Sequence, residues 1–120
     1  MTPSEIIDKD AERLGYDAEI VKRKIAKVLK LGAGILLRSN NSLLLLLALN
    51  AEDAELHLYS ADTPLTMAKS LKDFIQKIRA SNLKRVYGSG DIPQVLALLK
   101  KFGVDVQESN LPNYRWMATV

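Results

Sequence analysis

The chain has 120 residues, 48% of them hydrophobic and 26% charged, which is ordinary for a soluble globular protein and predicts a single domain over residues 1–120. The net charge of +3 permits an acidic partner but is too small to indicate a nucleic-acid-binding protein. The lack of cysteine excludes disulfides, thiolate catalysis and cysteine-ligated zinc, and a single histidine excludes a multi-histidine metal site within one chain.

The chain starts with MTPSEIIDKD, which is polar and acidic where a secretory signal would be basic and then apolar. The longest apolar run, Leu43 to Leu49, is far shorter than the roughly 20 residues that a membrane helix needs. We therefore expect neither a secretory signal peptide nor a membrane span.

Two helices are predicted before the first strand. Thr2 and Glu5 form a capping box around Pro3, Gly15 ends the first helix, and Asp17 caps the second. The residues expected to face inward are Ile6, Ile7, Ala11 and Leu14 on the first helix, and Ile20, Val21, Ile25, Val28 and Leu29 on the second.

The outer face of the second helix holds the densest positive cluster of the chain. Its members are Lys22, Arg23, Lys24, Lys27 and Lys30. A solvated helix face is the simplest interpretation, and a surface for a partner protein or for nucleic acid is the alternative. No aromatic residue accompanies the cluster, which disfavours binding of single-stranded nucleic acid.

Three strands are predicted next, at Ile35–Arg38, Ser42–Leu49 and Ala54–Ser60, with a tight turn at residues 39–41 joining the first two. The leucine run of the second strand has no polar alternation, so we expect a central strand covered on both faces.

The third strand carries the one set of residues that resembles catalytic equipment. Leu56 and Leu58 share one face, whereas Glu55, His57 and Tyr59 share the other. On one side of a sheet, neighbours of such a set lie about 7 Å apart. A carboxylate, an imidazole and a phenol in that arrangement could perform general acid–base chemistry. The alternative is that His57 is a satisfied, partly buried strand residue and that Tyr59 serves packing.

The longest helix is predicted to be capped by Thr63 and to begin at Pro64. Its buried stripe is Met67, Leu71, Phe74, Ile75 and Ile78.

A strand at residues 85–87 and a glycine turn at residues 88–90 follow the longest helix. The next helix is predicted to be capped by Asp91, with Pro93 in its first turn, and to close at Gly103. Two strands are predicted to complete the chain, at residues 104–108 and 114–120. On the last strand, Tyr114, Trp116 and Ala118 are expected to share one face.

The resulting order is two helices, three strands, a helix, a strand, a helix and two strands, an α+β class. This order, with the run Lys100-Lys101-Phe102-Gly103-Val104, resembles the GNAT N-acetyltransferase fold over roughly Asp17 to Val120, without that fold's usual first strand. The resemblance implies a GNAT-like domain with a mixed, mostly antiparallel sheet flanked by helices, in the order α-α-β-β-β-α-β-α-β-β.

Acetyltransferases of this fold bind the acetyl-CoA pyrophosphate with a Gln/Arg-x-x-Gly-x-Gly/Ala loop at a helix N-terminus. The corresponding stretch here, SADTPLTM at residues 60–67, has no glycine or arginine, and Pro64 removes one N–H donor. The family's catalytic tyrosine and its asparagine would fall near Leu99 and Ile92, which cannot replace them. The resemblance therefore implies a scaffold that has lost its acetyl-CoA chemistry and needs no cofactor.

The small size, the SADTP loop and the terminal pattern ESNLPNYRWMATV resemble short GNAT-like proteins of tailed bacteriophages, some of them internal virion proteins. This resemblance implies a non-catalytic structural or interaction protein, located in a virion or in the cytoplasm of the infected cell. Its partners would be other protein chains, and self-association is left open.

Several surfaces could bind such a partner. The candidate residues are Lys22, Arg23, Lys27, Lys30 and, if it is exposed, Trp116. An open sheet edge at Ile35–Arg38 or at the last strand could pair with another chain. A host-protein inhibitor acting through the basic face of residues 22–30 is a third hypothesis.

The alternative is a small acetyl-CoA-dependent N-acetyltransferase with an unusual cofactor loop. Glu55 or His57 would then be the base, and Tyr59 or Tyr87 the acid. The candidates for cofactor binding are Thr63, Leu65 and Thr66.

Overall fold

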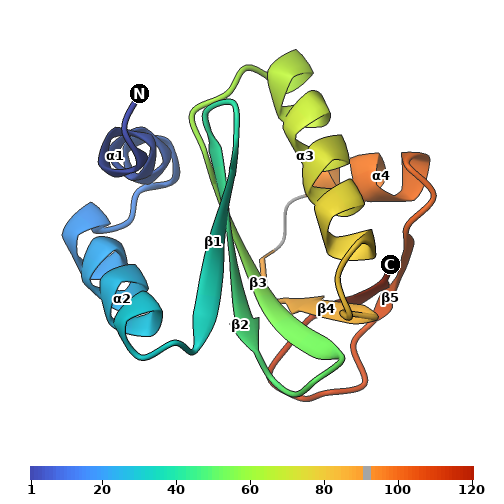
Figure 1. Cartoon of the computed structure of the whole chain (residues 1–120). Coiled ribbons are helices and arrows are strands. Elements are labelled where there is room, and N and C mark those ends of the chain that lie inside the picture. The colour runs from blue at the N-terminus through green and yellow to red at the C-terminus, as the bar shows by residue number, and fades with distance from the viewer. Residues whose placement is uncertain (91–92) are drawn as a thin grey trace.

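The structure is a computed structural model that describes residues 1–90 and 93–120 (Figure 1). The helices are α1 (Pro3–Leu14), α2 (Ala18–Lys30), α3 (Pro64–Arg79) and α4 (Pro93–Lys101). The strands are β1 (Gly34–Ser39), β2 (Ser42–Ala48), β3 (Asp53–Ser60), β4 (Arg85–Gly88), β5 (Asp105–Glu108) and β6 (Trp116–Thr119). The element order confirms the one predicted. The expected cap at Asp91 and the position of Ile92 lie outside the described residues.

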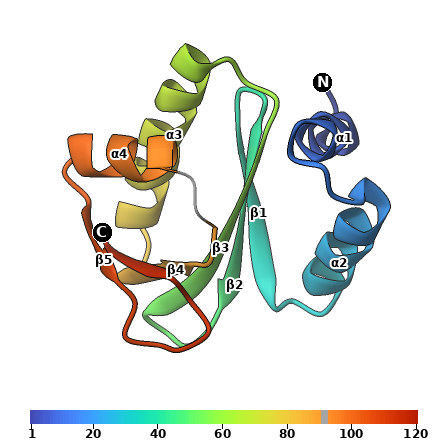
Figure 2. The ribbon, with the colours of Figure 1, turned by 180° about the vertical axis from the view of Figure 1, so that it is seen from behind.

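The strands form one sheet in the order β1-β2-β3-β4-β6-β5. All neighbours are antiparallel except β3 and β4, which run parallel. Helices α1 and α2 lie on one side of the sheet and α3 and α4 on the other, as Figures 1 and 2 show from opposite directions. The predicted mixed, mostly antiparallel sheet flanked by helices is therefore confirmed.

Strand β2 contributes side chains to both apolar clusters, one on each face of the sheet. Leu44 and Leu46 belong to the cluster beneath α3 and α4, whereas Leu43 and Leu45 belong to the cluster beneath α1 and α2. All four side chains are at most 4% exposed. Because successive strand residues point to opposite faces, an unbroken leucine run satisfies two apolar layers at once.

The predicted helix caps that fall in the described residues are formed. Thr2 and Glu5 make the reciprocal capping box of α1, and Gly15 closes it in the left-handed region with φ 78°. Asp17 accepts the backbone N–H of Glu19 at 2.9 Å. Gly103 has φ 82°, the conformation that glycine adopts without strain after a helix.

The inward faces of the first two helices are narrower than predicted. Leu14, Ile20 and Leu29 were expected to be buried, but they are 54%, 62% and 41% exposed. Helices α1 and α2 pack mainly against each other and the sheet, and nothing in the described residues covers their outer sides. An apolar stripe in sequence gives the direction of a buried face but not its width.

No helix among the described residues combines the length and the apolar composition that crossing a membrane requires.

The junction of β3 with β4 depends on an ion pair at its start. Arg85 Nε donates to Asp53 Oδ1 at 2.6 Å, and Asn50 Nδ2 donates to Asp53 Oδ2 at 2.8 Å. These hydrogen bonds, that of Arg85 first, lower the pKa of Asp53. The parallel pairing is short, because it joins only residues 53–55 of β3 to residues 85–87 of β4.

We expect Asp53→Asn to destabilise the fold in a pH-dependent way. A carboxyl whose pKa is lower in the folded state stabilises that state above its unfolded pKa, near 4, and this stabilisation is lost as the pH falls through the folded pKa. The stability gap between wild type and variant should therefore be full at neutral pH and should shrink below about pH 4. Urea unfolding at several pH values measures it. A gap that is unchanged in acid would contradict a role for the Asp53 charge.

Candidate functional site

Strand β3 places the predicted acid–base residues on one face, as expected. Glu55, His57 and Tyr59 stand opposite Leu47, Leu45 and Leu43 of β2, all on the side of α1 and α2. His57 Nε2 lies 3.4 Å from Glu55 Oε2, so the two form an ion pair only when His57 is protonated. This Nε2 is buried and has no hydrogen-bond partner in the described part of the chain. The structure thus brings Glu55 and His57 together.

Tyr59 has a different environment. Its side chain packs against the cluster beneath α1 and α2. Burial first, and then the carboxylates of Asp10 and Glu55, raise the pKa of Tyr59 to about 12. Tyr59 therefore keeps its proton at neutral pH and can donate a hydrogen bond, but it cannot act as a base.

Two further tyrosines lie next to Glu55. Tyr87, the other predicted acid, pairs with Glu55 in the sheet and is 3% exposed. Its hydroxyl donates to Asn110 Oδ1 at 3.3 Å, and its ring centre lies 5.5 Å from that of Tyr114. Burial, followed by the charge of Glu55 and a hydrogen bond to it, raises the pKa of Tyr114.

The sequence analysis misplaced Tyr114. It was expected to share a face with Trp116 and Ala118, but β6 begins at Trp116. Trp116 and Ala118 enter the core beneath α3 and α4, whereas Tyr114 packs on Tyr87, the partner of Met117 on the other face. The alternation rule does not apply to a residue that precedes the strand.

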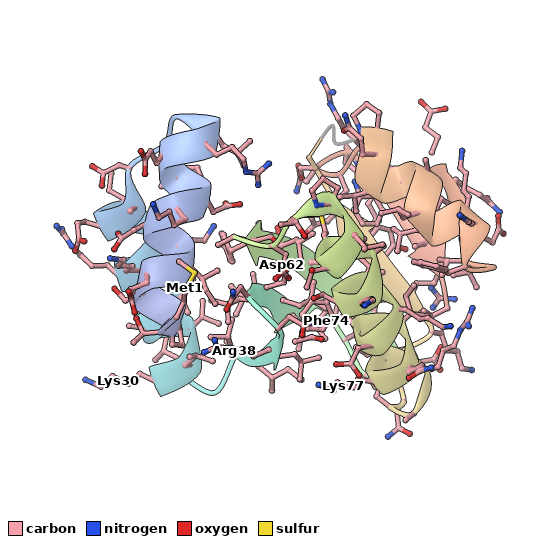
Figure 3. All side chains as sticks on the ribbon, turned by 90° about the horizontal axis from the view of Figure 1, so that it is seen from above. Met1, Lys30, Arg38, Asp62, Phe74 and Lys77 are labelled. Carbon is pink, nitrogen blue, oxygen red and sulfur yellow. The ribbon has the colours of Figure 1, made fainter. Side chains whose placement is uncertain are left out.

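The loop between β3 and α3 is organised around the carboxylate of Asp62. Its Oδ2 accepts the hydroxyls of Ser42 at 2.6 Å and Ser70 at 2.9 Å, and its Oδ1 accepts the backbone N–H of Asn41 at 3.0 Å. Asp62 thereby ties the loop to the β1–β2 turn and to α3. Figure 3 shows Asp62 beside the beginning of α3, facing the space between the two pairs of helices.

The predicted cofactor-binding residues lie at the start of α3, where the polar groups of Thr63 and Thr66 hydrogen-bond to each other. The Thr63 hydroxyl accepts the Thr66 N–H at 3.4 Å and donates to the Thr66 hydroxyl at 3.1 Å. Leu65 is 73% exposed, and Pro64 has no N–H. The loop thus offers few backbone donors, beside a carboxylate that would repel an anion.

A second carboxylate lies behind the same loop. Asp10 of α1 is 2% exposed and accepts the Ser60 N–H at 3.0 Å, Arg13 Nη2 at 2.8 Å and the Tyr16 hydroxyl at 2.6 Å. Burial first, and then the hydrogen bond to Asp10, raises the pKa of Tyr16. Asp10 and Asp62 were not singled out in the sequence, because nothing local distinguishes them from surface acids.

Strands β3 and β4 pair only over residues 53–55 and 85–87, and β3 continues to Ser60 without β4, which ends at Gly88. Two hollows lie beside this part of β3. The first, of about 160 Å³, is lined by residues that include His57, Gly88 and Trp116. The second, of about 490 Å³, is lined by Asp10, Arg13, Leu14, Leu58, Ser60, Asp62, Pro64, Met67, Gln94, Val95 and Leu98.

The candidate partner-binding residues differ in exposure. Arg23, Lys27 and Lys30 of α2 are exposed, as predicted for a solvated or partner-binding face. Lys22 instead bonds to Asp8 at 2.6 Å and to Glu19 at 3.3 Å. The hydrogen bond to Asp8, ahead of that to Glu19, raises the pKa of Lys22.

Trp116 is not available as a surface contact. It is 8% exposed, and its Nε1 donates to the Gly90 carbonyl at 3.1 Å. A partner-binding role was conditional on its exposure, and the buried ring instead packs in the core over Gly88. Leu99, near which the sequence resemblance places the acetyltransferase tyrosine, is likewise buried in the core.

The comparisons with known proteins bear on the fold. No family model and no curated protein matches the chain. Among solved structures, a chimeric spermidine N-acetyltransferase from Vibrio cholerae SpeG and hSSAT (K23-Q34) superposes with a TM-score of 0.53 at 14% identity, covering 98% of this chain and 89% of its own. A related chimera (K23-Y30) gives a TM-score of 0.45 at 14% identity, covering 85% and 74%.

A Sphaerobacter thermophilus protein assigned as an acetyltransferase gives a TM-score of 0.42 at 16% identity, covering 68% of this chain. This chain spans less than two thirds of that protein, 58% of its length. At such identities, the similarity to the longer-aligned chimera establishes a GNAT-like fold and nothing finer.

Proposed function

We propose that this chain is a non-catalytic GNAT-like module that acts by binding another protein. The observation that supports this proposal most strongly is the position of Asp62. Its carboxylate lies just before α3, in the loop that corresponds to the phosphate-binding loop of the family, and it holds two hydroxyls and a backbone N–H there. A fixed negative charge at this place disfavours a pyrophosphate by direct repulsion.

Acetyl-CoA does not fit the loop at residues 60–67 for two further reasons. A helix N-terminus binds phosphate through free N–H groups, but Pro64 has no N–H and the N–H of Thr66 donates to the Thr63 hydroxyl. No glycine allows the backbone to approach a ligand closely. The hydrogen bonds of this loop connect β3 to α3 and stabilise that connection.

The exposed surface supports binding to a protein. Helix α2 carries exposed cations, and exposed apolar side chains such as Ile20 and Leu31 lie on or next to it. A structural role within a virion and a bacteriophage source stay predictions of the sequence resemblance. Inhibition of a host protein would use the same basic face, residues 22–30.

One observation favours the alternative, a small N-acyltransferase. Glu55 and His57 form a close pair on β3. His57 also lines the smaller of the two hollows, which lies beside β3 near the end of β4. A base there could act on an amine if a cofactor were held by groups other than the loop.

Release of free thiol from acetyl-CoA separates the two functions. The chain has no cysteine, so a thiol-reactive dye reports only CoA. With spermidine or a lysine-containing peptide as acceptor, we expect no more thiol than from a Glu55→Gln/His57→Asn variant, which removes both candidate bases. Release above that of the variant would overturn the non-catalytic function and make this pair catalytic.

A further inference from the structure

Strand β1 is an end strand of the sheet, and its outer side has no neighbouring strand in residues 1–90 and 93–120. It joins β2 through a two-residue turn, with Ser39 opposite Ser42. The pair that flanks such a turn is hydrogen-bonded, and bonding then alternates along the ladder. The backbone N–H of Ala48 donates to the Ala33 carbonyl at 3.1 Å, so the same alternation of hydrogen-bonded pairs holds at the other end of the β1–β2 ladder.

This alternation of hydrogen-bonded pairs along the β1–β2 ladder determines which backbone groups of β1 point away from the sheet. Odd-numbered residues bond to β2, so Gly34, Leu36 and Arg38 direct their N–H and C=O groups outward. The Arg38 carbonyl accepts Lys77 Nζ at 3.3 Å. The other outward groups form a ladder that an added strand could complete.

The C-terminal end of this edge carries a net positive charge. Arg38 lies between Met1 and Lys77 in Figure 3, with its side chain bound to the Met1 carbonyl. Ile35, on the same strand, is 55% exposed and adds an apolar contact. Asp73 and Lys77 form an ion pair at 3.2 Å in which the two charges offset each other, so the net positive charge comes from Arg38.

The charge at this edge favours an acidic occupant. In an antiparallel pair of two β1 strands centred on Leu36, Arg38 of each copy would lie opposite Gly34 of the other, so a second copy would leave the Arg38 charge uncompensated. An acidic strand would meet this cation with opposite charge, and its apolar side chains could contact Ile35.

We propose that the β1 edge binds an extended, acidic segment of a partner protein by β-strand addition. This inference deepens the proposed protein-binding function, on which it rests, by naming the surface and the partner class. Acetyl-CoA turnover would overturn the non-catalytic function without affecting strand addition, whereas failure of strand addition would leave the missing phosphate site unchanged.

Three capped decapeptides serve as probes. In the first, Glu alternates with Val; in the second, Lys replaces each Glu; in the third, every second Val of the first is replaced by Pro, which keeps the charge but cannot pair as a strand. We expect the first to bind in a salt-sensitive way, the second not to bind, and the third to bind at least tenfold more weakly. No binding of the first peptide, or equal binding of the third, would overturn the proposal.

Two variants locate the surface. Leu36→Pro and Leu36→Ala both remove the side chain, but only proline removes the outward N–H, which makes no bond to β2. We expect proline to weaken binding of the first peptide at least tenfold relative to alanine, and equal affinities would overturn the proposal.

Amide exchange in the wild-type chain gives a readout that does not depend on variant folding. Binding of the Glu/Val peptide should slow exchange at Leu36 and Arg38 more than at Ile35 and Leu37, which already bond to β2. Unchanged exchange at the outward amides would count against strand addition. A dimer of the free chain that Leu36→Pro dissociates and Leu36→Ala does not would assign the edge to a second copy and overturn the acidic partner.

Discussion

Replacing Asp10 with alanine is expected to destabilise the protein by about 3 kcal/mol, measured by urea unfolding at neutral pH. The Asp10 carboxylate is 2% exposed and accepts three hydrogen bonds, from Ser60, Arg13 and Tyr16. Its loss leaves the buried Ser60 N–H without a partner, and an unsatisfied buried donor costs more than the bond itself contributes.

Asp8 provides the matched control on the same helix. Its carboxylate also forms an ion pair, with Lys22 at 2.6 Å, but it is 53% exposed. Exposed pairs contribute little, because water and salt screen them. Asp8→Ala should therefore cost much less than Asp10→Ala. Equal losses would show that α1 is not fastened to β3 through Asp10.

Replacing Gly88 with alanine is expected to cost about 3 kcal/mol, at the upper end for overpacking. A Cβ at this position would lie 2.1 Å from Cζ2 of Trp116, whose ring is itself buried. The ring cannot move away without also losing its hydrogen bond to the Gly90 carbonyl. Because Gly88 has no side chain, the Trp116 ring can pack directly against the backbone at the end of β4.

A double-mutant cycle tests this cause. In a Trp116→Leu background the indole is absent, so Gly88→Ala should cost much less than in the wild type. Additive losses would show that the substitution acts on the backbone of β4 rather than on the ring. Thermal unfolding of the four proteins gives the coupling.

The sequence predicted the features that depend on near neighbours. The capping box at Thr2 and Glu5 and the two-sided burial of β2 follow from spacing alone. Element order followed from the same local signals, and order was sufficient to indicate the GNAT-like fold that the comparison with a solved structure supports.

The features that the sequence did not reveal depend on distant contacts. Asp10 accepts from Ser60, and Asp62 accepts from Ser42, so each carboxylate acquires its role only when α1, β2 and β3 meet. Tyr114 was misplaced because a loop, not the strand, directs its ring. The shared face of Glu55 and His57 on β3 was predicted correctly, since it needed only the period of a strand, whereas their role as catalytic residues stays a prediction.

The proposal that this chain lacks a phosphate site rests on the groups present in residues 60–67. In this segment Pro64 has no N–H, the Thr63 hydroxyl accepts the N–H of Thr66, and Asp62 supplies a negative charge. The helix N-terminus of α3 still favours negative charge, and the adjacent Asp62 carboxylate already provides it.

Calorimetric titration of the purified chain with acetyl-CoA tests most directly whether this fold has lost its cofactor. An active GNAT acetyltransferase titrated in the same buffer is the positive control. We predict no saturable heat up to millimolar acetyl-CoA, because a fixed carboxylate and a proline stand in the loop where phosphates would bind. Saturable heat at micromolar concentration would contradict this account, and it would make Glu55 and His57 the first residues to replace.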